Sequence, residues 1–163
     1  MGMPPPRIIS QTPRLAYKKG TKTLRNIGNL LGQENLPIYV FGSYATARKN
    51  DVEEFTSESD LDLFVEYDSF DILDRILRED HFNREVIKRS RGKITDVIYT
   101  KPEFTLIHID PISRLEDRIK KLIQRYDISV ETEGNLKYLA LPSKNRVAPR
   151  DKQIWKILTR RNF

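Results

Sequence analysis

Cysteine is missing from this sequence altogether. Its absence excludes disulfide bonds and thiolate metal sites, and allows an intracellular location in the cytoplasm, the nucleoid or the nucleus, or in a host cytoplasm if the chain is viral. Long apolar runs are missing too, since no stretch approaches the roughly 20 residues that a bilayer-spanning helix needs. We therefore expect no membrane partner. Internal repeats and low-complexity tracts are also absent, which is typical of an ordinary globular chain.

Negative charge is scarce in the last third of the chain. Residues 111–163 hold 13 Lys and Arg against 6 Asp and Glu, whereas residues 1–110 hold 16 against 17. The net charge of +6 therefore comes wholly from the last third. This asymmetry indicates a polyanion partner, most often nucleic acid, although a merely solvated basic surface explains the charge about as well.

The order of apolar patterns predicts the fold class. Helical spacing alternates with short β-type runs, and Arg91-Gly92 separates two such runs in the manner of a hairpin turn. The expected elements are a helix over 14–32, strands over 37–42 and 61–67, a helix capped by Ser69, a hairpin over 84–100, a strand over 104–109, a helix over 112–126, two short strands and a last helix. This order predicts an α+β fold with a mixed sheet and flanking helices. Trp155, on the last expected helix, is expected to lie in the hydrophobic core.

Two carboxylates stand one residue apart at the start of an apolar strand. Side chains of a strand alternate between faces, so Asp60 and Asp62 are expected to point the same way and to repel each other unless a cation lies between them. Oxygen ligands favour Mg²⁺ or Mn²⁺. Upstream, Gly42 and Ser43 follow another apolar strand, where backbone N–H groups can hold a phosphate.

Asp96 is the best candidate for a third carboxylate, because it too is acidic inside an apolar strand. With it, the residues suit nucleotidyl transfer with two Mg²⁺ or Mn²⁺ ions. A solvated edge strand is the alternative reading of Asp96. His108, in another apolar strand, is interpreted as a packed core histidine rather than a ligand.

These residues resemble the nucleotidyltransferase superfamily built on the DNA polymerase β palm. The pattern of a hydrophobic residue, Gly and Ser, then Asp-h-Asp-h, then h-Asp-h, is met by FGS at 41–43, DLDL at 60–63 and TDVI at 95–98. The run from 95 to 122, with GNLKYLAL and APRDKQIWKIL further on, is similar to DNA polymerase family X, and the match covers roughly residues 25–158.

The resemblance implies a reduced palm-plus-thumb enzyme similar to compact viral members. It implies a flexible arm at 1–13, a palm at 14–110 and a basic thumb-like α/β subdomain at 111–163. Its metal ligands would be Asp60, Asp62 and Asp96, and its triphosphate loop Gly42 and Ser43. A basic stripe on the helix over 112–126 would contact DNA phosphates without reading sequence. Its members follow steps of four, three and four residues: Arg114, Arg118, Lys121 and Arg125.

The chain departs from the family pattern at three places. The spacer between Ser43 and Asp60 has 16 residues, which is longer than the usual pattern. The arginines expected directly after Gly-Ser are absent, so Arg48 or Lys49 would have to reach the triphosphate. The Phe-Thr-Gly that contacts the incoming sugar is replaced by Ile109-Asp110-Pro111.

The resulting hypothesis is a monomeric, metal-dependent enzyme of DNA repair that uses nucleoside triphosphates to extend a DNA 3′-hydroxyl in gapped or primer–template DNA. One alternative is a minimal nucleotidyltransferase that modifies RNA or a protein, as in some toxin–antitoxin pairs. Another is a non-catalytic nucleic-acid-binding subunit with a remnant palm. Three carboxylates argue against the latter, because without metal they would only repel nucleic acid.

Overall fold

The computed structural model describes residues 13–32, 36–141 and 147–159. The elements confirm the predicted α+β class, because five helices flank one seven-stranded mixed sheet. The helices are α1 (Pro13–Leu31), α2 (Gly42–Lys49), α3 (Tyr67–Glu79), α4 (Leu115–Tyr126) and α5 (Lys152–Thr159). The strands are β1 (Ile38–Phe41), β2 (Leu61–Glu66), β3 (Asn83–Ser90), β4 (Lys93–Thr100), β5 (Ile107–Ile112), β6 (Ser129–Glu133) and β7 (Leu136–Ala140). The predicted arm lies outside the described residues except for Pro13, where α1 begins.

The sheet has the order β3-β4-β5-β2-β1-β7-β6, which places β2 at its centre. Strand β2 pairs antiparallel with β1 and parallel with β5. The β3–β4 hairpin forms one end of the sheet, and its turn residues Arg91 and Gly92 both have positive φ, as the hairpin prediction requires. No helix in the described part of the chain is both long and apolar enough to cross a membrane.

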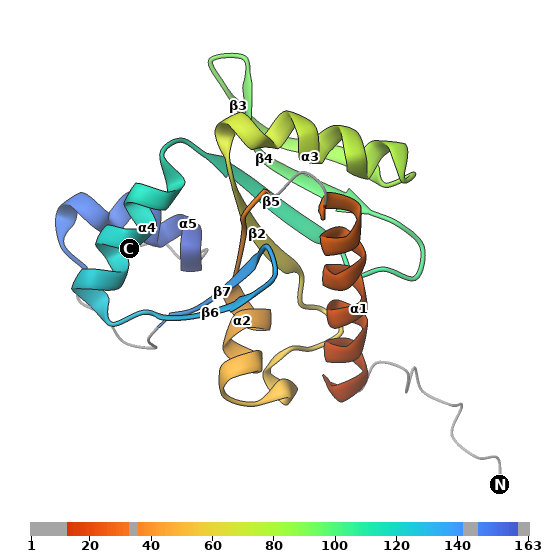
Figure 1. The fold of residues 1–163 in the computed structure, drawn as a ribbon, viewed down its shortest axis with the longest axis horizontal. Coiled ribbons are helices and arrows are strands. Elements are labelled where there is room, and N and C mark those ends of the chain that lie inside the picture. Colours follow the sequence, from red (N-terminus) through yellow and green to blue (C-terminus); the bar gives the residue numbers. More distant parts are fainter. Residues whose placement is uncertain (1–12, 33–35, 142–146, 160–163) are drawn as a thin grey trace, which may run out of the picture.

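The two faces of the sheet carry separate cores. On one face, Leu61, Leu63 and Val65 of β2 pack in the same cluster as buried residues of α1, α2 and α3. On the other face, Phe64 stacks on Phe41 with ring centroids 3.8 Å apart, in the cluster that contains the buried residues of α4 and α5. Figure 1 shows this arrangement, with α1 and α3 on one side and α4 and α5 on the other. Each side chain fully buried in these clusters contributes about 1.5–3 kcal/mol of burial free energy.

Glu66, the last residue of β2, determines how α4 is attached. Its two carboxylate oxygens accept hydrogen bonds from the backbone N–H groups of Arg114 and Leu115, at 2.6 and 2.7 Å. These are among the N–H groups that a helix start leaves unpaired. The predicted capping of α3 by Ser69 is wrong, because α3 begins at Tyr67 and Glu66 stands at its N-cap position without a side-chain cap bond.

The last third of the chain extends the same sheet. Strand β7 pairs parallel with β1, and β6 pairs antiparallel with β7. The boundary expected after residue 110 falls inside β5. Trp155 is 2% exposed in the core beneath α4 and α5, as predicted.

A buried carboxylate ties α5 to α4. Asp151, in the short 3₁₀ turn before α5, is 6% exposed. Its oxygens accept hydrogen bonds from Arg125 Nη1 at 2.7 and 2.9 Å and from the Tyr126 hydroxyl at 2.7 Å. Burial raises the pKa of Asp151, but the bonds from Tyr126 and Arg125 outweigh it, so the net shift is downward.

We predict that Asp151→Asn lowers the free energy of unfolding by about 2 kcal/mol at neutral pH, because bonds to a charged acceptor are lost. Since the folded-state pKa lies below the unfolded value, the stabilisation is complete above the unfolded pKa of about 4 and is lost as pH falls through the folded pKa. Urea unfolding at pH 7 and in the acid limb checks this. If the free energy of unfolding differed between variant and wild type by the same amount at both pH values, the predicted pH dependence would be wrong.

Candidate active site

The three central strands direct polar side chains to the face that α4 and α5 cover. In the parallel pair β2–β5, Asp62 lies opposite His108 and Phe64 lies opposite Asp110. Directly paired residues share a face of a sheet. Because Phe64 belongs to the core under α4 and α5, Asp62, His108 and Asp110 lie on that same face.

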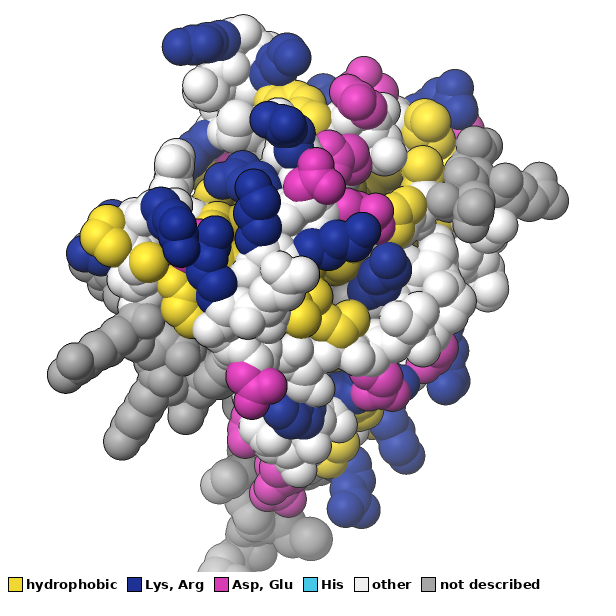
Figure 2. All heavy atoms as spheres, turned by 60° about the vertical axis from the view of Figure 1, so that its left-hand side comes forward, with side chains coloured by type: hydrophobic (Ala, Val, Ile, Leu, Met, Phe, Trp, Pro, Cys, Tyr) yellow, Lys and Arg dark blue, Asp and Glu magenta, His cyan; other side chains and the backbone are white. Residues whose placement is uncertain are grey.

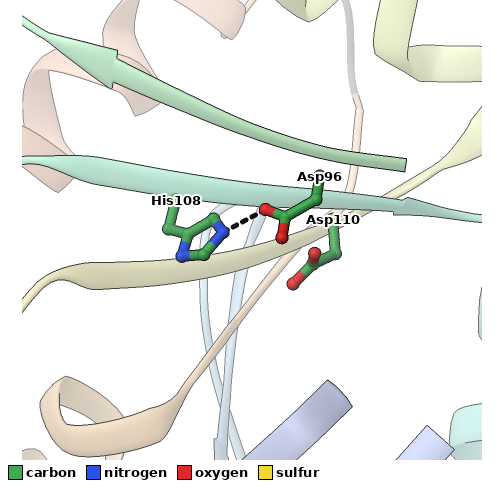
Figure 3. Close-up of side chains that lie close together, drawn as sticks. All are labelled: Asp96, His108 and Asp110. Atoms are coloured by element: carbon green, nitrogen blue, oxygen red, sulfur yellow. Dashed lines mark hydrogen bonds and ion pairs between the residues drawn. The ribbon is translucent and has the colours of Figure 1, made fainter. Parts of the chain in front are cut away.

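Asp96, His108 and Asp110 form a compact group of possible metal ligands. One ligand atom of each lies within 4.8 Å of the others. Figure 3 shows Asp96 and His108 turned toward one another, with the Asp110 carboxylate on the same side of the sheet. The Nε2 atom of His108 makes a hydrogen bond with Asp96 Oδ1, and Nδ1 lies 3.9 Å from Asp62 Oδ1. His108 therefore links the carboxylate of β2 to the carboxylate of β4.

Two members of this group were not predicted as site residues. The interpretation of His108 as a packed core histidine is wrong, because its ring lies between two carboxylates. Asp110 is 4% exposed and lies inside β5, although Asp-Pro in a sequence is typical of a turn. The alternation of His108 and Asp110 with buried Ile107 and Ile109 is the signal in the sequence that could have identified Asp110.

Gly42 is required beside Asp62. Its φ of +69° is in the left-handed region, and a Cβ atom built on it would lie 2.5 Å from Asp62 Oδ2. A side chain there would displace the carboxylate, so only glycine satisfies both the backbone and the contact. Helix α2 begins at this residue, which confirms the predicted strand, Gly-Ser and helix start. The first N–H groups of α2 therefore lie next to Asp62.

Asp60 directly precedes β2, which begins at Leu61, so its position on the same face as Asp62 stays a prediction. It lines a small cavity of about 260 Å³ together with Ala16 and Lys19 of α1. The compact ligand group does not include Asp60, and its role as a ligand stays a prediction.

A cleft of about 660 Å³ opens over the ligand group. Asp96 and Asp110 line it, and three cations from separate elements stand around them: Lys88 of β3, Arg118 of α4 and Lys156 of α5. Carboxylates at the floor and cations at the walls suit a substrate that carries phosphates together with a bound cation.

A β-bulge aims Lys88 into this cleft. The β3–β4 register jumps from Val86 opposite Val97 to Lys88 opposite Asp96, which leaves Ile87 without a partner and 43% exposed. Regular pairing would have put Ile87 opposite Asp96. The bulge therefore exchanges an apolar side chain for a cation on the face of the site.

The predicted basic stripe is divided by the structure. Arg114, Arg118 and Lys121 line a surface hollow of about 650 Å³ along α4. Arg125 instead forms the ion pair with buried Asp151. Figure 2, which brings the α4–α5 side forward, shows many Lys and Arg side chains gathered on this face.

Arg48 does not lie at the start of α2. It stands in the last turn, about 9 Å along the helix axis from Gly42. Its guanidinium pairs with Glu131 and Glu133 of β6 at 2.9 and 2.8 Å, and lies 4.2 Å from the ring centroid of Tyr138. These contacts fasten α2 to the β6–β7 hairpin. Lys49 is exposed in the same turn.

The site combines a Gly-Ser helix start beside Asp62 of the central strand with carboxylates on β4 and β5. This combination defines a site of the nucleotidyl-transfer class. The family model described as "Nucleotidyltransferase domain" matches residues 22–128. The chain belongs to this family.

Comparison with solved structures finds similar chains at low sequence identity. Terminal uridylyl transferase 4 from Trypanosoma brucei with bound CTP matches with a TM-score of 0.42 and 19% identity, over 76% of this chain and 42% of that chain. Cid1 in complex with the UTP analogue UMPNPP matches with a TM-score of 0.44 and 17% identity, over 69% and 35%. The chain thus spans less than half the length of these proteins. Comparison with curated proteins gave no match.

We predict that Gly42→Ala displaces the Asp62 carboxylate and lowers nucleotidyl transfer by about 10²-fold or more, while unfolding free energy falls by only about 1–2 kcal/mol. Gly134→Ala is the matched control, because Gly134 also has positive φ, at +60°, but nothing lies within 4 Å of its Cβ position. Both variants should lose similar stability. Equal activity in the two would show that the contact with Asp62 has no role.

Proposed function

We propose that the chain transfers a nucleotidyl group from a nucleoside triphosphate to the 3′-hydroxyl of a nucleic acid. The observation that carries this proposal is the group Asp96, His108 and Asp110, whose two carboxylates line a cleft together with three cations. Family membership supports the reaction type. The adjacent start of α2 supports a phosphate subsite.

The donor set fits a divalent cation. Asp96 and Asp110 supply carboxylate oxygens, which Mg²⁺ and Mn²⁺ prefer, and His108 adds a nitrogen donor, which Mg²⁺ does not favour. We propose Asp62, whose Oδ1 lies 3.9 Å from His108 Nδ1, as a further carboxylate ligand. Two ions, with Asp60 as a further ligand, remain part of the proposal. When bound, such an ion neutralises phosphate charge and makes a coordinated hydroxyl more acidic.

The residues of the cleft account for substrate placement and charge. Lys88, Arg118 and Lys156 attract the triphosphate, and the N–H groups at the start of α2 donate to its oxygens. The acceptor oxygen forms a bond to the α-phosphorus as the bond from that phosphorus to the bridging oxygen breaks, and pyrophosphate leaves with the electron pair. The hydroxyl proton passes to a carboxylate of the cluster or to solvent.

DNA is the acceptor that we propose first. The resemblance of residues 25–158 to family X polymerases and the basic side chains over α4 and α5 support extension of gapped or primer–template DNA, in a repair role. A monomeric enzyme at an intracellular location belongs to the same proposal.

RNA is the second candidate acceptor, and one observation favours it. The segment Ile109-Asp110-Pro111 stands where family X has its sugar-contacting Phe-Thr-Gly, but here it is part of β5 and carries Asp110 into the ligand group. Sugar selection of the family X kind therefore has no counterpart at this position. Uridylyl transferases and a poly(U) polymerase are among the structures of similar fold.

The test is incorporation of labelled dNTPs and NTPs, offered singly with Mg²⁺ or Mn²⁺, on one-nucleotide-gapped DNA, single-stranded DNA and RNA. We predict that Asp62→Asn and Asp110→Asn each lower incorporation by about 10²–10³-fold. Asp127→Asn, an exposed change directly after α4, is the control for charge and should keep activity.

Templated addition of the complementary dNTP on gapped DNA supports the polymerase proposal. Addition to RNA alone supports the second candidate. Transfer to no acceptor, or wild-type activity in Asp110→Asn, would overturn the assignment of the site.

The divided stripe on α4 gives a separate prediction. Replacing Arg118 and Lys121 by Gln should reduce the slope of log K against log salt by about 0.9 per lost duplex phosphate contact. Arg125→Gln should leave that slope unchanged and lower thermal stability instead, because Arg125 pairs with Asp151. Filter binding to duplex DNA at several salt concentrations measures the slope. An equal slope change in both variants would contradict the division.

A further inference from the structure

A second cavity of the described residues lies away from the ligand group. It is a groove of about 890 Å³ along α1, walled by Val52 and by Phe104 of the β4–β5 connection. Helix α1 packs on the face of the sheet that carries Leu61 and Leu63, opposite to the face of Asp62. The groove therefore lies across the sheet from the candidate active site.

Four cations line this groove, spaced by one helical turn. Arg14, Lys18, Lys22 and Arg25 follow steps of four, four and three residues, which places successive charges about 5–6 Å apart along the helix axis. Residues 13–32 contain no acidic residue. Within the described chain, none of the four cations forms an ion pair with a carboxylate.

The walls of the groove add aromatic and neutral surface. Lys22 Nζ lies 6.0 Å from the ring centroid of Phe104. Tyr17 also lines the groove and is held in place by stacking on Tyr44, with centroids 4.8 Å apart. From the acidic segment after α2, Val52 faces the groove rather than its neighbours Asp51 and Glu53.

We propose that the α1 groove binds a single strand of nucleic acid through its phosphates. A linear row of cations beside aromatic side chains is the combination with which proteins hold single strands without reading sequence. Rigid spacing on one helix lowers the entropy cost of aligning the charges. The inference rests on the proposed function, and makes α1 a second contact for the acceptor strand, away from its reacting end.

The test is fluorescence anisotropy of labelled 20-nucleotide DNA and RNA single strands at several salt concentrations, without nucleoside triphosphate. The double variant Lys18→Gln/Lys22→Gln should bind about tenfold more weakly at low salt, and its salt slope should fall by about 1.4, or 0.7 for each single-strand phosphate contact. Lys19→Gln is the matched control, since Lys19 lies on the same helix but outside the groove, against the small cavity beside Asp60. The double variant removes two charges and the control removes one. The single variants Lys18→Gln and Lys22→Gln are therefore also compared with Lys19→Gln, because each removes one charge.

The outcomes separate this inference from the proposed function. If the groove variants bind single strands as tightly as wild type, or lose no more affinity than Lys19→Gln does, the α1 groove is not the binding site. That result would overturn the inference regardless of which nucleotidyl transfer the enzyme performs. If binding depends on the groove but no nucleotide is transferred, the inference stands and the proposed function falls. Polyglutamate is the probe for an acidic protein partner: if it displaces the strand as well as an unlabelled strand of equal charge, the assignment to nucleic acid is overturned.

Discussion

The structure depends on the two-sided burial of the central strand β2. Its odd-numbered residues Leu61, Leu63 and Val65 are buried in the core beneath α1 and α3. Its even-numbered residues face the other way and have three different roles. Asp62 lies against Gly42 at the start of α2, Phe64 stacks on Phe41, and Glu66 accepts the first N–H groups of α4. A shift of one residue in the register of β2 would exchange the faces and remove site, core and helix attachment together.

The sequence predicts those parts of the fold and the site that local chemistry determines. Apolar spacing predicts the helices and strands. Arg91-Gly92 predicts the hairpin, and Gly42-Ser43 predicts the junction of strand and helix. The partners of each strand depend on contacts between distant residues, so the placement of β5 between β4 and β2 was not predicted. For that reason Asp110 and His108 were missed as site residues. The same limit explains Arg48 and Arg125, whose partners lie 83 and 26 residues away in the sequence.

Net charge by segment was an incomplete guide to binding surfaces. The basic excess of residues 111–163 does appear around the cleft and along α4. However, residues 1–110 are nearly balanced only because the cations of α1 and of the β3–β4 hairpin are offset by acidic residues elsewhere. Folding separates these charges, so that basic surfaces lie on both faces of the sheet.

The bulge at Ile87 also affects how readily two copies of the chain can associate through the edge of the sheet. Strand β3 is the outer strand of the sheet, and an outer strand presents unpaired backbone groups to any neighbouring chain. A regular strand with Ile87 exposed would invite association edge to edge. The bulge interrupts the repeat of N–H and C=O groups at that residue, and Lys88 and Arg89 give this edge a positive charge. The irregularity that aims Lys88 at the cleft therefore also breaks the regular edge with which another chain could pair.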